Sequence, residues 1–231
     1  MVQNYEEFLD ELLKAGFSLG GGSAEGIFAI VDWNWITDAP DGTNVQWHTG
    51  DIEHDPWEWR MRVLDERKDI AYAKIFFKKS GFVTREWYPY FMAARRGGLS
   101  FGDAYAAGKL SHFAKRIYDM VAENGALPSH MIKQMGAFGR EDKAAFDRAL
   151  VELQMGMYLT MCGSADRVSL SGGVQGWSSN VMCTVEEFFG IGILEEAREI
   201  TPEQAYSAIA SQVMLLNPMA TEKKVRKFVF G

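Results

Sequence analysis

Long apolar runs are missing from this chain of 231 residues. No stretch approaches the roughly 20 apolar residues that a membrane-spanning helix needs, and the acidic, amphipathic N-terminus has no signal-peptide pattern. Cysteine is also scarce, with Cys162 and Cys183 alone in the sequence. Both fall on segments that we expect to be neighbouring strands, so a disulfide is geometrically possible, but reduced thiols are favoured. These absences predict a cytoplasmic protein with no membrane partner.

Positive charge is unevenly distributed along the chain, whose net charge is −7. Residues 1–60 carry a net charge of −10, residues 61–120 carry +6, and residues 121–231 carry −3. The overall acidity argues weakly against a nucleic-acid partner, whereas the basic middle block permits a local surface that faces phosphates. Hydrophobic residues make up 47% of the chain and aromatic residues 13%, as in a folded protein with ample core.

The stretch from Ser111 to Thr184 has the element order of a winged helix-turn-helix, judged by capping residues, glycines and apolar spacing. The expected elements are helices over 111–125, 128–136 and 140–154, followed by strands over 157–161 and 181–183. The loop between the two strands contains Gly163, Gly172, Gly173 and Gly176. Three helices followed by a glycine-tipped hairpin predict an α+β, mainly helical fold.

We expect three divisions of the chain. Residues 1–110 form an α+β portion with an aromatic, acidic loop and a basic hairpin, residues 111–184 form the winged helix-turn-helix, and residues 185–231 form a helical extension. Further elements are expected from the same signals. They are helices over 4–16, 100–108 and 201–217, a strand over 27–36, and a basic C-terminal element over 221–230.

The third helix of the 111–184 stretch is the candidate recognition helix. Its apolar stripe consists of Phe146, Ala149, Leu150 and Leu153. On a helical wheel, Arg140, Ala144 and Arg148 lie on the opposite side. A recognition helix needs cations for phosphates and a small residue where it meets the groove, so we assign DNA contact to Arg140, Lys143 and Arg148. In the alternative interpretation these cations merely solvate an exposed face.

The most unusual local sequence is QWHTGDIEHDPWEWR, residues 46–60. Its second half has a structural interpretation, because Asp55 can cap a helix that has Pro56 at its first position and Glu58 in the capping box. The remaining residues group histidines and aspartates with tryptophans in a predicted loop, where functional residues often lie. Together with Asp55 itself, the group consists of Trp47, His48, Asp51, His54, Trp57 and Trp59.

Three interpretations of this group are open. A metal site would use His48, Asp51 and His54, although their spacing matches no metal signature that we recognise. A pocket walled by indoles would hold a flipped or unpaired base or another flat ligand, and its residues would be Trp47, Trp57, Trp59 and Arg60. In the third interpretation the tryptophans fill the core and the polar residues cap helix ends. We expect no metal and no cofactor.

The basic middle block contains two candidate phosphate contacts. Residues 71–79 alternate as a strand and end in Lys78 and Lys79, with a turn expected at Ser80–Gly81. Such lysines suit an edge strand protected from aggregation and equally a strand laid along a DNA backbone. A helix expected from Thr84, with Pro89 bending it or marking its start, ends in Arg95 and Arg96. We expect Arg95, Arg96, Arg140 and Arg148 to share one positive face beside a cleft that holds Asp51.

Three segments together carry a family resemblance. They are FFKKSGFVTREWYPYF (76–91), LPSHMIKQMG (127–136) and DRALVELQMG (147–156), with Arg95 and Arg96 between the first two. An aromatic Trp-Tyr-Pro box followed at this distance by a winged helix resembles the AlkZ-type DNA glycosylases, and most closely the smaller AlkZ-related proteins. The resemblance covers roughly residues 46–184. It implies contact with DNA and excision of alkylated or crosslinked bases.

The sequence departs from that family at the catalytic motif. AlkZ-type glycosylases position the attacking water with Gln-x-Gln or Gln-x-Asp, and this chain contains neither, so no catalytic residue is carried over. Hydrolysis of an N-glycosidic bond needs a carboxylate or polar pair that stabilises an oxocarbenium-like centre and orients water. On that chemistry the candidates are Asp51 and His48, although a lone Asp in a Gly-Asp turn is more often a cap.

The sequence therefore predicts a DNA-binding winged-helix protein of the base-excision type that lacks the glutamine motif. One alternative is a non-catalytic regulatory or protein-interaction module whose aromatic cleft holds a protein segment or a small molecule. Another is a small-molecule enzyme that uses His48, Asp51 and His54.

Overall fold

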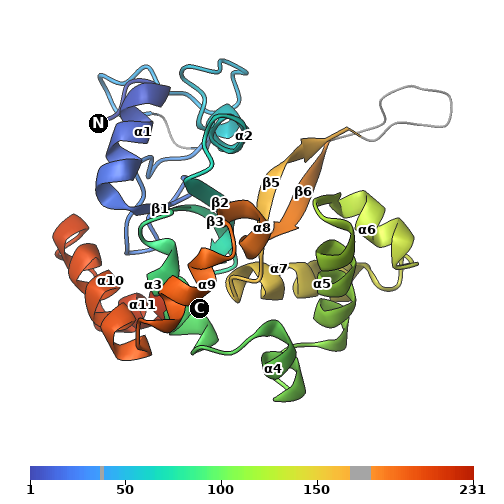
Figure 1. Cartoon of the computed structure of the whole chain (residues 1–231). Helices are drawn as coiled ribbons and strands as arrows, with labels where there is room; N and C mark the ends of the chain where they lie inside the picture. The colour runs from blue at the N-terminus through green and yellow to red at the C-terminus, as the bar shows by residue number, and fades with distance from the viewer. Residues whose placement is uncertain (37–38, 167–177) are drawn as a thin grey trace, which may run out of the picture.

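A computed structural model describes residues 1–36, 39–166 and 178–231. Within these residues, strands from the whole chain form one antiparallel sheet in the order β1–β3–β2–β5–β6–β4, with helices packed around it (Figure 1). The strands are β1 (Phe17–Leu19), β2 (Ile70–Phe76), β3 (Lys79–Thr84), β4 (Leu127–Pro128), β5 (Leu159–Ala165) and β6 (Ser179–Thr184). Gly172, Gly173 and Gly176 lie outside the described residues.

More of the described residues lie in helices than in strands, so the α+β, mainly helical class is confirmed. In the first half of the chain the helices are α1 (Tyr5–Ala15), α2 (Pro56–Glu66), α3 (Tyr88–Arg96), α4 (Phe101–Ala106) and α5 (His112–Asn124). In the second half they are α6 (Ser129–Met135), α7 (Lys143–Met155), α8 (Val185–Phe189), α9 (Gly192–Arg198), α10 (Pro202–Leu216) and α11 (Glu222–Phe230).

Several helices begin and end where their capping residues predict. The Asn4 side chain accepts a hydrogen bond from the Glu7 amide at the start of α1, and Gly16 ends that helix in the left-handed region with φ 83°. Ser111 caps α5 in the same way. Thr201 forms a full capping box at the start of α10. These local signals place the helix boundaries where the sequence predicts them.

The sheet and the core join the first two expected segments. Tyr72 of β2 pairs with Met161 of β5, which links the β2–β3 hairpin to the β5–β6 hairpin. One hydrophobic cluster contains Trp59 of α2 together with Ile117 of α5 and Phe146 of α7. The N-terminal portion therefore packs directly on residues 111–184 rather than standing apart from them.

A second cluster is formed by α3 and the C-terminal helices. Phe228 of α11 stacks on Phe76 with ring centroids 4.2 Å apart and meets Phe91 of α3 edge-on at 5.4 Å. Val213 of α10 is buried in the same cluster. In Figure 1 α10 and α11 lie beside α3, so the chain end covers the face of α3 that is turned away from α5.

Two strand predictions were wrong in detail. Residues 27–36 form turns rather than a strand, because single hydrogen bonds such as Leu19 N–H to Phe28 O replace a ladder. The strand expected over 71–79 ends at Phe76, and it is an interior strand because β2 lies between β3 and β5, which excludes the edge-strand alternative. The Lys74 amide donates to the side chain of Gln154, on α7, at 2.9 Å, so a helix residue takes the place of a strand partner there.

The hairpin turn and the next helix were also misplaced by a few residues. The turn lies at Phe77 and Lys78, with φ 52° and 63°, and not at Ser80–Gly81. Gly81 is in β3, where a Cβ atom would come within 2.5 Å of the Phe76 ring, so its small size serves close packing. Pro89 marks the start of α3, which does not extend back to Thr84.

Candidate functional site

Helix α7 buries one face and exposes the other as its periodicity predicts. Phe146, Ala149 and Leu153 are buried, whereas Ala144 and Arg148 are exposed. Arg140 is exposed in the segment just before the helix, which begins at Lys143 instead of about residue 140. The three cations assigned to DNA contact therefore lie on, or directly before, the solvent-facing side of one helix.

The surface beside the start of α7 is hollowed and mixed in charge. A cavity of about 230 Å³ is lined by Lys133, Phe138, Gly139, Arg140, Lys143 and Phe146. Asp147 lies 3.5 Å from the Lys133 ammonium and 3.3 Å from that of Lys143. These exposed ion pairs are weak and easily exchanged, so a phosphate can compete with Asp147 for both lysines.

Arg95 does not join this surface. Its guanidinium group is turned inward and donates to four backbone carbonyls, at 2.7–2.9 Å. These are the carbonyls of Ile75, Met155, Phe228 and Val229. Burial lowers the pKa of Arg95 to about 10, so it stays charged at neutral pH. Arg95 therefore ties the C-terminal ends of α7 and α11 to β2 and is not available to a phosphate.

Arg96 is also interior, with 6% of its surface exposed. Its Nη1 donates to Glu186 Oε1 at 2.9 Å, its Nη2 donates to the Met157 carbonyl, and the guanidinium lies over the Tyr158 ring, 4.4 Å from the centroid. The expectation that Arg95, Arg96, Arg140 and Arg148 share one exposed positive face is thus wrong for the first two. Adjacent arginines at a helix end are charged whether or not they face solvent, and sequence periodicity does not separate the cases.

Lys78 and Lys79 lie at the tip of the β2–β3 hairpin, where the fold brings them to the basic C-terminal helix. Glu25 pairs with Lys79 and lies 3.9 Å from the Lys224 ammonium. The ammonium groups of Lys224 and Lys227 lie 5.6 and 5.7 Å from the Phe77 ring centroid. Two basic segments that are far apart in the sequence therefore form one cluster, and Glu25 contacts a lysine of each.

The tryptophans of residues 46–60 separate into two environments. Trp59 is 1% exposed and packs in the core against Tyr5 and Phe8, and the cavity beside it measures only about 10 Å³. Trp47 and Trp57 belong instead to a cluster on the surface, together with Trp35 and His48. Trp59 therefore fills the core, as the third interpretation of this stretch has it.

The aromatic rings of this surface cluster pack against one another. His48 lies 4.9 Å from the Trp57 ring centroid, and the Arg60 guanidinium lies over the Trp57 ring at 3.4 Å. The Trp47 indole donates to the Trp33 carbonyl at 3.0 Å, whereas Trp35 is 63% exposed. Because Trp57 already has neighbours on its ring, Trp35 is the member of this cluster that offers most free surface.

Asp55 holds the turn that carries these rings. Its side chain is fully buried and accepts hydrogen bonds from the amides of His48, Gly50 and Trp57, at 2.8–3.0 Å. Asp51 is exposed and accepts from the Glu53 amide at 2.9 Å, and its second oxygen lies 2.8 Å from His54 Nδ1. The hydrogen bond with His54 lowers the pKa of Asp51, which keeps this carboxylate ionised at neutral pH.

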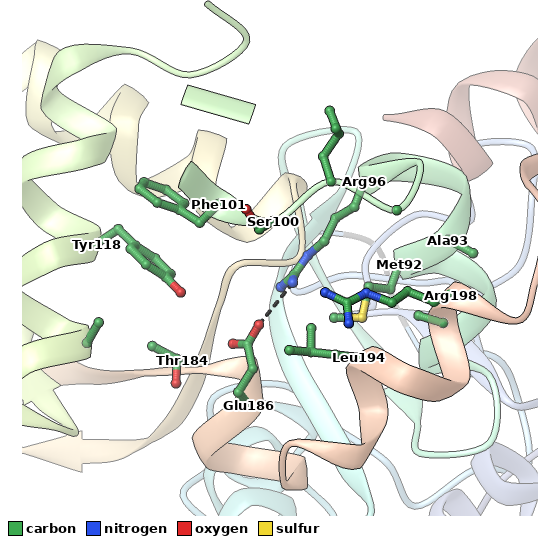
Figure 2. Close-up of a pocket in the computed structure, with 14 residues that line it drawn as sticks. Met92, Ala93, Arg96, Ser100, Phe101, Tyr118, Thr184, Glu186, Leu194 and Arg198 are labelled. Carbon is green, nitrogen blue, oxygen red and sulfur yellow. Dashed lines mark hydrogen bonds and ion pairs between the residues drawn. The ribbon is translucent and has the colours of Figure 1, made fainter. Parts of the chain in front are cut away.

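A larger cavity, of about 270 Å³, opens between α3, α4, α5 and the α8–α9 segment (Figure 2). Arg96 and Glu186 form its charged floor, Phe101 and Tyr118 form one wall, and Arg198 lines it from α9. Burial raises the pKa of Tyr118, so its phenol remains protonated. Arg96 apart, the sequence pattern pointed to none of these residues, because they meet only where five separate segments converge.

Within the described residues, no group of three or more His, Cys, Asp and Glu side chains is placed to hold a metal ion. His48, Asp51 and His54 therefore do not form such a group. Cys162 and Cys183 are both unoxidised, on the paired strands β5 and β6. No described helix is long and apolar enough to cross a membrane.

The comparison with protein families gives a match along nearly the whole chain. A family model described as AlkZ related matches residues 2–230. The chain belongs to the AlkZ-related family. Neither the curated proteins nor the solved structures contain a match to it. The resemblance seen over residues 46–184 therefore extends to the N-terminal helix and to the C-terminal helices of this AlkZ-related protein, and it makes the protein DNA glycosylase-like.

Proposed function

We propose that this AlkZ-related protein binds double-stranded DNA through the exposed face of α7 and acts as a diverged base-excision protein. The observation that carries the proposal is the exposure of Arg148 opposite the buried Phe146–Leu153 stripe, together with the exposure of Arg140 and Lys143 at or just before the start of α7. The small, exposed Ala144 lies on this face too, which allows close approach to the groove. Membership of the AlkZ-related family also supports DNA binding, since AlkZ-type glycosylases act on DNA.

We further propose that residues 111–184 are a winged helix-turn-helix. The element order α5, β4, α6, α7, β5, β6 supports this, as does the pairing of β4 with β6. In such a unit, α7 enters the major groove and the β5–β6 loop contacts the flanking backbone. That loop includes residues 167–177, which lie outside the described residues. Lys78 and Lys79 are proposed as a second, non-specific phosphate contact.

For base excision, the proposed carboxylate is Asp51, with His48 beside it on the same turn. Asp51 is exposed and ionised, as a group must be to stabilise positive charge on a sugar ring. The Asp55 hydrogen bonds to the amides of His48 and Gly50 fix the backbone of this turn. A fixed backbone limits the reorganisation that catalysis would require.

Replacing both Arg140 and Arg148 by glutamine is expected to weaken duplex binding about tenfold and to reduce the salt slope of log K by about two, one for each lost phosphate contact. The measurement is fluorescence anisotropy of a labelled duplex over a salt series. Lys14→Gln is the matched control, because its ammonium is 70% exposed on α1, far from α7 in the sequence. Equal affinities for the double variant and the parent would show that the exposed face of α7 is not the DNA-binding surface.

Asp51→Asn is expected to reduce release of an alkylated base at least about 100-fold with unchanged duplex affinity, since it removes charge stabilisation and not a phosphate contact. The readout is base release from a duplex with a single N-alkylated purine, followed by chromatography. Asp41→Asn, also at an exposed position, is the control. If the parent protein binds the duplex but releases no base, the proposal of catalysis is wrong, whereas the proposal of DNA binding stands.

A second candidate function rests on the apolar surface around the ring cluster. Trp35 of the ring cluster is 63% exposed and the next residue, Ile36, is 80% exposed, and adjacent exposed apolar side chains often mark protein contacts. This supports the alternative of a non-catalytic interaction module. It requires that the Arg140→Gln, Arg148→Gln variant behave as the parent on DNA while changes at Trp35 abolish partner binding.

A further inference from the structure

One wall of the Arg96–Glu186 cavity is formed by a stacked aromatic pair. Phe101 and Tyr118 stack with ring centroids 3.7 Å apart and planes inclined by 12°, and Tyr158 meets Phe101 edge-on at 5.3 Å. Leu99, Met92 and Leu194 add apolar lining. A planar apolar ring fits beside this pair and the apolar lining, because aromatic and apolar contacts stabilise it there.

The cavity also carries excess positive charge. Two guanidinium groups, of Arg96 and Arg198, line it with one carboxylate, Glu186, which leaves a net charge of +1. In Figure 2 both guanidinium groups point into the same space. Arg198 is exposed and, among the described residues, has no ion-pair partner. An anionic group placed between the two arginines relieves their repulsion and matches the fork of Arg198.

The floor of the cavity is incompletely paired. Arg96 Nε and Glu186 Oε2 are both buried and have no hydrogen-bond partner in the structure. Arg96 as a whole is 6% exposed. Unpartnered buried donors and acceptors are costly, and each calls for an explanation such as an ordered water or a bound ion.

We propose that this cavity binds a flat aromatic ring that carries an anionic group, with the ring beside the Phe101–Tyr118 pair and the anion at Arg198. Two kinds of compound have this chemistry, nucleoside monophosphates and aromatic carboxylates. The proposal does not depend on the α7 surface, since none of the cavity residues is on α7.

The test is isothermal titration of the full chain with four probes: guanosine 5′-monophosphate, guanosine, indole-3-carboxylate and inorganic phosphate. At least one ring anion is expected to bind, and more tightly than guanosine or phosphate alone. Binding of the nucleotide only, or of the carboxylate only, identifies the source of the anion. No binding of either ring anion at millimolar concentration, or equal binding of free phosphate, would overturn the proposal.

Variants connect the binding to this cavity. Arg198→Gln is expected to weaken the ring anion at least about tenfold, the effect of one charge-assisted contact. Ala122→Phe, at an exposed position that lines the cavity, is expected to abolish binding by filling the space. Lys14→Gln on α1 is the control and is expected to leave probe affinity unchanged. Unchanged affinity in both Arg198→Gln and Ala122→Phe places the probe elsewhere and refutes the site, whatever the outcome on DNA.

Discussion

Arg95→Met is expected to lower the free energy of unfolding by about 3–5 kcal/mol, because it leaves several carbonyls without a donor and each unsatisfied buried group costs about 1–3 kcal/mol. Methionine keeps much of the side-chain volume but donates no hydrogen bond. The carbonyls of Ile75, Met155, Phe228 and Val229 would all lose the donor that they share. Three of them end helices, so the variant also removes a cation from two negative helix termini.

The measurement is urea unfolding followed by circular dichroism. Arg148→Met is the matched control, because Arg148 is exposed and its loss should change stability by no more than about 0.5 kcal/mol. Arg95→Lys is expected to fall between the two, since an ammonium keeps the charge but cannot reach all four carbonyls from one position. If Arg95→Met lowers the free energy of unfolding by less than about 1 kcal/mol, water replaces the guanidinium group and Arg95 does not hold α7, α11 and β2 together.

Local signals predicted the helices of this protein well because each signal acts within a few residues. Asn4, Ser111 and Thr201 cap helices through their own side chains, and the α7 stripe follows from a period of 3.6 residues. Strand predictions were poorer. Residues 27–36 have strand-like composition but lack a partner strand, and a partner is a property of the fold rather than of the segment.

The spacing of Trp57 and Trp59 already indicated that their side chains face different sides of a helix, which the loop interpretation did not take into account. Residues two apart on a helix do not face the same side, and both tryptophans lie within α2. Their exposed fractions are 37% and 1%. A single pocket walled by both was therefore excluded once Asp55 was accepted as the helix cap.

The charged residues were the least predictable part of the site. Arg95 and Arg96 are consecutive, yet the first binds backbone carbonyls and the second pairs with Glu186, 90 residues away in the sequence. In the sequence, Glu186 looks like an ordinary first-turn acid of α8. No periodicity relates these positions, since their proximity depends on how α3 packs against α8 and α9.

Asp55→Ala is expected to cost about 3 kcal/mol, from the loss of one helix cap and of two further amide partners. Asp55 is fully buried and serves three amides, those of His48, Gly50 and Trp57. His48 also has φ 61°, a conformation that costs about 1 kcal/mol or more for a non-glycine residue and persists only when its surroundings hold it. Without the carboxylate, the turn is expected to relax and the Trp57–His48 contact to be lost.

Two matched variants separate the cap from the turn. Asn is as good a helix cap as Asp, but it has one acceptor oxygen, so Asp55→Asn should keep α2 capped and lose the bond to Gly50. Its cost is expected to be about half that of Asp55→Ala. Asp51→Ala, on the same turn but exposed, should cost under about 1 kcal/mol. Urea unfolding gives the stabilities, and tryptophan fluorescence reports the ring cluster. Equal losses for Asp55→Asn and Asp55→Ala would mean that the Gly50 bond, and not the helix cap, holds the turn together.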